Sequence, residues 1–107
     1  MTRIDIAQDF SPAPSGRFPT DGPNSGERFR EQFLRPAILA GGEIEVIIDG
    51  TAGYHSSFLE EAFGGSVRLR YIGKDDFRQR LRITYTDSDF EMFKDMIEFF
   101  IEDAIAN

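Results

Sequence analysis

The fold is decided by one stretch of the chain, which reads Glu43-Ile44-Glu45-Val46-Ile47-Ile48-Asp49, then Gly50-Thr51-Ala52-Gly53-Tyr54-His55, then Ser56-Ser57-Phe58-Leu59. Its first part begins with alternating polar and apolar residues and ends in three consecutive β-branched aliphatic residues. A continuous apolar run is typical of a strand covered on both faces, so residues 43–49 predict the central strand of a sheet. The glycine-containing part that follows predicts a loop, and the last part predicts the start of a short helix.

On the N-terminal side of this strand, the pattern predicts one short strand, an irregular connection and one helix. Apolar and polar residues alternate over residues 3–6, which indicates a strand with one buried face. Residues 8–24 hold four of the five prolines and predict an irregular connection. Apolar residues at helical spacing then predict a helix that ends at about Ala40, with Asn24 as its N-cap and Glu27 as the capping-box partner.

On the C-terminal side, the pattern predicts one short helix, two further strands and a long terminal helix. The short helix should end at Gly64-Gly65. Alternation predicts strands over residues 67–71 and 81–85, joined by a single helical turn that begins at Asp75. Because a parallel crossover usually takes a dozen residues or more, an antiparallel hairpin competes with a parallel pairing here. A capping box and a phenylalanine-rich apolar stripe predict a helix over residues 88–104.

This order of elements predicts a small α/β domain with a mixed sheet of about four strands and three to four helices. The chain of 107 residues has the length of a single domain. We expect residues 1–24 to form an N-terminal strand and a Pro/Gly-rich loop, and residues 25–107 to form the core.

Composition narrows the function classes. The formal net charge of −7 argues against a nucleic-acid-binding protein, because neutralising phosphates needs a basic surface. The chain has no cysteine and one histidine, so we expect no metal site and no cofactor. No apolar run reaches the length of about 18 residues that crosses a membrane, and no signal peptide is evident, so we expect a cytoplasmic protein without a membrane partner.

The predicted loop and the helix start after it form the most informative candidate site. In α/β sheets ligands bind at the carboxyl ends of strands, where a helix N-terminus also favours anions. Ser56 and Ser57 are therefore candidate anion or phosphorylation sites. The surrounding candidate partner or ligand loop consists of Asp49, Gly50, Thr51, Gly53, Tyr54, His55 and Phe58.

Two other interpretations of these residues stay open. Ser56 or Ser57 could serve only as a helix cap, with Glu60 as the capping-box partner of Ser57. His55 and Ser57 could act as base and nucleophile, but the Gly-x-Ser-x-Gly turn of hydrolases is missing. We therefore expect no catalytic residue and no enzymatic activity.

The strand that ends in Asp49, together with the loop and serine pair after it, resembles the STAS domain of anti-sigma-factor antagonists. The string Ser57-Phe58-Leu59-Glu60-Glu61-Ala62-Phe63-Gly64-Gly65 is similar to that of a bacterial STAS-like family of uncharacterised function. The antagonists carry a regulatory serine in an Asp-Ser-Ser-Gly turn, which an anti-sigma kinase of the histidine-kinase-like ATPase class phosphorylates. This chain has His55 in place of that Asp and Phe58 in place of that Gly.

The resemblance implies a STAS-like fold and a non-enzymatic regulatory module for protein interaction. It implies a histidine-kinase-like ATPase or an anti-sigma-type regulator as the partner, and Ser57 as the serine that is phosphorylated. The first alternative is a domain that senses a small anion or a nucleotide, with Arg68 or Arg70 as the counter-charge. A small serine hydrolase is the remote alternative, and the oligomeric state stays unassigned.

Overall fold

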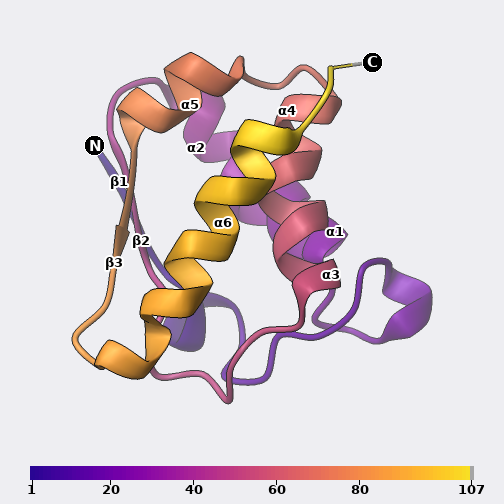
Figure 1. The fold of residues 1–107 in the computed structure, drawn as a ribbon. Helices are drawn as coiled ribbons and strands as arrows, with labels where there is room; N and C mark the ends of the chain where they lie inside the picture. Colours follow the sequence, from indigo (N-terminus) through magenta and orange to yellow (C-terminus); the bar gives the residue numbers. More distant parts are fainter. Residues whose placement is uncertain (107) are drawn as a thin grey trace.

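The computed structural model describes residues 1–106, which form an α/β fold. Asn107, the last residue of the predicted domain, lies outside the described residues. Figure 1 shows the strands on one side of the molecule and the helices packed beside them. The elements in chain order are β1 (Thr2–Asp5), η1 (Ile6–Phe10), η2 (Pro19–Asp21), α1 (Gly26–Phe29), η3 (Arg30–Leu34), α2 (Arg35–Ala40), β2 (Ile44–Ile47), α3 (Ser56–Leu59), η4 (Glu60–Gly64), α4 (Gly65–Arg68), α5 (Lys74–Arg80), β3 (Leu81–Thr84), η5 (Ser88–Phe90) and α6 (Glu91–Asp103).

The sheet of the described residues has three strands in the order β1-β2-β3, and both pairings are parallel. The central position of β2 confirms the prediction from its sequence. The expected fourth strand is wrong, and so is the expected mixed pairing. Residues 67–71, which were to form that strand, lie instead at the end of α4 and in the turn after it. The antiparallel hairpin between the last two predicted strands is therefore absent.

The helices cover one face of the sheet (Figure 1). Ile44, Val46 and Ile48 are fully buried against them, whereas Ile47 between them is half-buried on the opposite face. The prediction that β2 is covered on both faces is therefore wrong. The side chains of the strand alternate between the two faces, as in a sheet with one packed face. Ile47 is the middle residue of the apolar run, and its side chain lies on the open face.

The helical segment over residues 26–40 contains a π turn, η3, between α1 and α2. Its N-cap is Ser25, whose hydroxyl accepts from the Arg28 amide at 3.2 Å, and not the predicted Asn24. In the π turn the Arg35 amide donates to the Arg30 carbonyl, five residues back. The wider turn lies directly before Pro36, which has no amide hydrogen for a regular helical bond.

The second long helical segment, over residues 56–68, also contains a π turn, η4, between α3 and α4. Gly64-Gly65 was predicted to close this helix, but the glycines lie inside it. Val67 is buried and Leu69 is exposed, so their alternation with arginines reflects a helix end rather than a strand. The connection from β2 to β3 therefore includes this segment and α5, which is long enough for a parallel crossover.

The terminal helix α6 confirms the predicted helix and packs its Ile97 and Ile101 into the core. The predicted capping box of Ser88 is wrong, because Asp87 caps the short turn η5 that precedes α6. No helix in the described residues is both long and apolar enough to cross a membrane.

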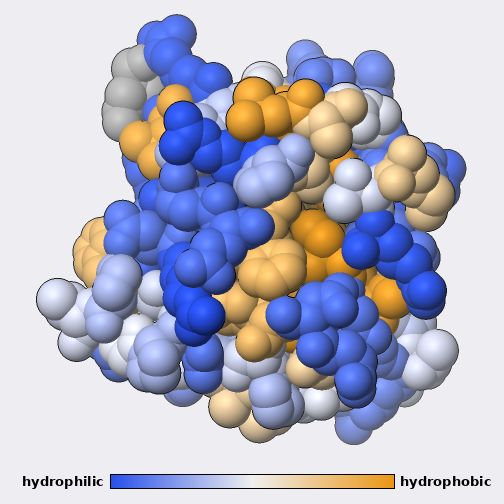
Figure 2. Space-filling model, turned by 180° about the vertical axis from the view of Figure 1, so that it is seen from behind, coloured by the Kyte–Doolittle hydropathy of each residue, from blue (hydrophilic) through white to orange (hydrophobic). Residues whose placement is uncertain are grey.

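On the side of the molecule opposite to the view of Figure 1, apolar atoms gather at the centre of a mostly hydrophilic surface (Figure 2). Among residues 1–106, four phenylalanines that pack against the core are only partly buried. Two of them, Phe10 and Phe33, have ring centroids that lie 5.7 Å apart. Both pack on the fully buried Phe29, and the guanidinium of Arg28 lies 5.4 Å from the Phe10 ring centroid. The aromatic core thus extends to the surface beside the first long helical segment.

The one-sided packing of the sheet predicts very different effects for a charge placed on its two faces. Val46→Asp buries an unpaired carboxylate and should lower the free energy of unfolding by about 4 kcal/mol or more. Ile47→Asp places the same group on the half-exposed face and should cost about 1 kcal/mol. Urea denaturation of both variants measures the difference. Equal losses in the two variants would show that both faces are packed.

Candidate functional site

The predicted site loop starts at Asp49, whose carboxylate binds the chain just beyond β3. Its Oδ2 accepts from the Thr86 amide at 2.6 Å, from the Thr86 hydroxyl at 2.7 Å and from the Asp87 amide at 3.2 Å. These hydrogen bonds, above all those from Thr86, lower the pKa of Asp49. Asp49 thus ties the end of β2 to the turn that leads into α6.

Tyr54 and Phe58 of the predicted loop are core residues. Phe58 is fully buried, and Tyr54 is buried with its hydroxyl donating to the Ile48 carbonyl at 2.6 Å. The Tyr54 ring lies 5.3 Å from the Phe93 ring and 5.8 Å from the Phe58 ring. Burial raises the pKa of Tyr54, so the hydroxyl stays protonated and holds the loop against the strand.

The exposed part of the loop is shaped by Gly50 and Gly53. Both have positive φ angles, 86° and 105°, which side chains disfavour. The Thr51 hydroxyl accepts from the Gly53 amide at 3.2 Å and closes the turn between them. Of the predicted loop, only the stretch from Gly50 to Gly53 and His55 remain for contact with a ligand or partner.

Ser56 and Ser57 are the first two residues of α3, and His55 is its N-cap without a side-chain cap hydrogen bond. The interpretation of either serine as a helix cap is therefore wrong, and Glu60 does not act as a capping-box partner. Ser56 is exposed, whereas Ser57 is half-buried. Ser57 lines an open depression of about 560 Å³ together with Ser15, Gly16, Arg17, Phe18, Asp21 and His55.

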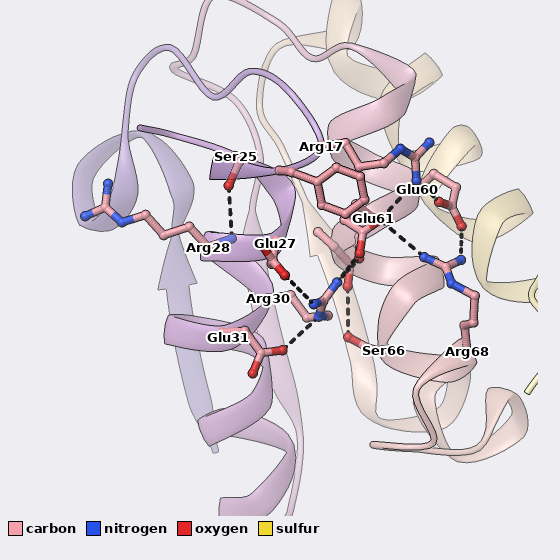
Figure 3. A network of polar contacts seen from close by, with 12 residues as sticks. Arg17, Ser25, Glu27, Arg28, Arg30, Glu31, Glu60, Glu61, Ser66 and Arg68 are labelled. Atoms are coloured by element: carbon pink, nitrogen blue, oxygen red, sulfur yellow. Dashed lines mark hydrogen bonds and ion pairs between the residues drawn. The ribbon is translucent and has the colours of Figure 1, made fainter. Parts of the chain in front are cut away.

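A network of ion pairs, which the sequence did not predict, lies directly beside this depression (Figure 3). Arg17 binds Glu60 and also Glu61, with 3.1 Å between Arg17 Nη1 and Glu61 Oε1. Arg68 binds the same two carboxylates, at 2.5 Å from Glu60 and 3.4 Å from Glu61. The network thus joins the N-terminal loop to the middle and to the C-terminal end of the segment that carries Ser57.

The centre of the network is the buried ion pair of Arg30 and Glu61, whose side chains are 4% and 7% exposed. The Arg30 guanidinium also donates to the Glu61 carbonyl at 3.0 Å and binds Glu31 at 2.9 Å. Glu31 in turn accepts from the Tyr71 hydroxyl at 2.7 Å. Every charged group near the centre therefore has at least one opposite charge in contact.

The two π turns bring these residues together, because η3 begins at Arg30 and η4 begins at Glu60. The two helical segments also approach closely. A Cβ on Gly26 would lie 2.5 Å from the Phe58 carbonyl oxygen, and one on Gly65 would lie 2.9 Å from Arg30 Nη1. The π turns and these glycines thus lie where the two helical segments cross closely, with an ion pair at the centre of the crossing. We call it the Arg30–Glu61 crossing.

Ion pairs favour the charged forms of Glu60 and Arg30 in the network. Burial raises the pKa of Glu60, but its ion pairs with Arg68 and Arg17 outweigh burial, so the pKa is lowered overall. Burial also lowers the pKa of Arg30, and its contacts with Glu31 and Glu61 outweigh that effect in the opposite direction. Glu60 and Arg30 are therefore both held in their charged forms at neutral pH.

The alternatives that the sequence left open concern Arg68 as a counter-charge and His55 with Ser57 as base and nucleophile. Arg68, one proposed counter-charge for an anion, is bound to Glu60 and Glu61. In the part of the chain that the structure describes, no hydrogen bond joins His55 to Ser57, and no cluster of His and carboxylates could hold a metal ion. Arg17 is the cation that lines the depression with Ser57.

The buried ion pair predicts that Arg30 matters far more for stability than a surface arginine of the same helical segment. Arg30→Ala leaves the Glu61 carboxylate buried without its main partner and should cost about 3–5 kcal/mol. Arg35→Ala, which removes a half-exposed ion pair with Glu31, should cost about 1 kcal/mol or less. Chemical denaturation monitored by circular dichroism compares the two. A loss below about 1 kcal/mol for Arg30→Ala would contradict the central role of the pair.

Comparison with known proteins finds one family. A family model described as a STAS-like domain of unknown function (DUF4325) matches residues 25–91, which is more than half of the chain. No curated protein matches this chain. No solved structure matches it either. The matched residues include the Arg30–Glu61 crossing and Ser57, whereas Arg17 and β1 lie outside them. The chain belongs to the family of STAS-like domains of unknown function.

Proposed function

We propose that this STAS-like domain is a non-enzymatic regulatory module that binds a partner protein, and that phosphorylation of Ser57 controls the binding. The observation that carries the proposal is an exposed apolar stripe on α6 that adjoins the loop from Gly50 to His55. The stripe consists of Met92 and Phe99, which are 59% and 60% exposed, and of Met96 between them, which is partly buried against the core.

The stripe has the geometry of a binding surface on a helix. Its three residues are spaced at i, i+4 and i+7, so they lie on one side of α6. Large apolar residues that gather on a surface are typical of interaction sites. The loop adjoins α6 through Phe93, because a Cβ on Gly53 would lie 3.5 Å from the Phe93 ring. We call the loop and the stripe together the loop–α6 surface.

The class of partner follows from the resemblance to anti-sigma-factor antagonists. We propose a histidine-kinase-like ATPase, or another anti-sigma-type regulator, as the protein that binds the loop–α6 surface. An ATPase of this class is also the source of the phosphoryl group for Ser57. The open depression supports this role, because Ser57 lies at its wall beside the exposed His55.

Arg17 supplies a physical mechanism for the switch. Glu60 and Glu61 lie three and four residues after Ser57, so all three side chains share one side of the helical segment. Arg17 binds both glutamates and lines the depression with Ser57. A phosphoryl group on Ser57 adds about −1.5 to −2 charges and competes with Glu60 for the Arg17 guanidinium. The N-terminal loop that carries Arg17 would then shift beside the loop–α6 surface.

The second candidate function is the sensing of a small anion or a nucleotide by the same depression. Arg17 at its wall and the first turn of α3 favour an anion there. Binding of an anion would draw Arg17 away from Glu60 in the same way as a phosphoryl group on Ser57. The two functions are distinguished by whether the charge arrives covalently bound to Ser57 or as a free ligand.

Partner binding is tested with variants of the stripe and a matched control. Met92→Ser with Phe99→Ser should abolish capture of a histidine-kinase-like ATPase encoded by the same genome, because the apolar contact area is lost. Leu39→Ser removes an equally apolar residue on α2 that is 78% exposed and should leave capture unchanged. Biolayer interferometry with the purified ATPases measures the effect. Equal binding by the double variant and the control would contradict the loop–α6 surface.

Phosphorylation is tested by incubating the protein with ATP and each of those ATPases, followed by intact-mass analysis. The wild-type protein should gain one phosphoryl group, Ser57→Ala should gain none, and Ser56→Ala should behave as the wild type. Arg17→Ala should still be phosphorylated, but its amide NMR spectrum should change less on phosphorylation than that of the wild type. If no ATPase modifies the protein, or if the phosphoryl group is mapped to another residue, the Ser57 switch is wrong.

A further inference from the structure

The strand β3 has an unpaired outer edge. It is the last strand in the sheet order β1-β2-β3 and pairs with β2 alone. The Ile48 amide donates to the Thr84 carbonyl at 3.0 Å, so the backbone groups of Thr84 point toward β2. Backbone directions alternate along a strand, and the amide and carbonyl of Ile83 therefore point to the outer edge. An unpaired edge of this kind is a template for a further strand.

A groove of about 580 Å³ runs along this edge, with residues 81–84 of β3 on one side and α6 on the other. Lys94, Glu98 and Ile101 line the α6 side. Thr84 also lines the groove, and its side-chain oxygen is buried and has no hydrogen-bond partner among residues 1–106. Within the described part of the chain, no fourth strand pairs with this edge.

The charges of the groove fit a second copy of the chain. Its two arginines have partners within the chain. Arg78 forms ion pairs with Asp75 and Glu102, and Arg82 forms an ion pair with Glu43. Lys94 and Glu98, in contrast, form no ion pair with any described residue. They lie one helical turn apart with Lys first, which is the weaker order for a pair within a helix. A twofold axis between them places Lys94 of each copy opposite Glu98 of the other.

We propose that the outer edge of β3 and the adjoining flank of α6 form an interface between two copies of this chain. The two β3 strands run antiparallel about a twofold axis at Ile83, and the Ile83 residues of the two copies exchange both amide–carbonyl hydrogen bonds. The two sheets then join into one continuous sheet of six strands. Two Lys94–Glu98 ion pairs between the copies fix the register on the α6 side.

A strand from another protein could use the same edge, since edge strands also accept extended peptides. The second copy is favoured because the two unpaired charges have opposite signs and form a self-complementary pattern under a twofold axis. A peptide of a single charge sign would satisfy one of them and oppose the other. The interface also lies on the flank of α6 away from Met92, Met96 and Phe99, so it is independent of the loop–α6 surface.

The test uses two charge reversals and their mixture, measured by sedimentation equilibrium. The wild-type protein should dimerise, and Lys94→Glu and Glu98→Lys should each weaken dimerisation by about tenfold or more, because each places like charges across the interface. An equimolar mixture of the two variants should recover dimers, since one chain then carries two glutamates and the other two lysines at the facing positions. Asp103→Lys, an exposed carboxylate of α6 outside the groove, should dimerise like the wild type.

Three results would overturn the proposal. A wild-type protein that stays monomeric up to about millimolar concentration has no such interface. A dimer that neither reversal weakens forms through another surface. Reversals that weaken the dimer without recovery in the mixture show that Lys94 and Glu98 do not face each other. Circular dichroism of each variant confirms that the reversals leave the fold intact.

Discussion

The arrangement of the helices depends on the buried ion pair of Arg30 and Glu61. Removing two charges from water is costly, and their attraction offsets this cost only when the geometry is good and the remaining hydrogen-bonding groups are satisfied. Here Arg30 contacts three carboxylates and a carbonyl, and Glu61 contacts three guanidinium groups. A crossing held in this way has one register, because a shift of either segment would separate the charges. The helices in turn define the face on which the sheet can pack.

Much of the architecture could be predicted from local patterns. Alternation that ends in the apolar run from Val46 to Ile48 identified the central strand, and the spacing of apolar residues identified α6 and the first long helical segment. These elements follow from the periods of strands and helices, which depend on each residue's near neighbours. The face covered by helices was misjudged, because Ile47 is as apolar as its neighbours and its half-exposure depends on what packs nearby.

The errors lie where long-range contacts override local signals. Gly64-Gly65 has the sequence of a helix end, yet it lies inside a helix. A glycine is needed at position 65 because a Cβ there would lie 2.9 Å from Arg30 Nη1, 35 residues earlier in the chain. Once the helix continues, Val67 and Leu69 belong to its last turn and the following loop, and the fourth strand disappears. One signal of the buried pair was present in the sequence. Glu61, with Glu60 before it, lies between the apolar pairs Phe58-Leu59 and Ala62-Phe63, a position where a solvated carboxylate is unusual.

The string that carries the family resemblance, Ser57 to Gly65, includes both the candidate serine and the structural centre of the fold. Glu61 forms the buried ion pair, Gly65 permits the close crossing, and Phe58 and Phe63 fill the core. Packing alone therefore accounts for most of this string, and family membership carries information mainly about architecture. Function depends on the residues that the packing at the Arg30–Glu61 crossing does not explain. Arg17 lies outside the matched residues 25–91 but reaches Glu60 and Glu61 from the N-terminal loop. Under the proposed function, a charge added at Ser57 would act through Arg17 on Glu60 and Glu61, and Glu61 joins the two helical segments through Arg30.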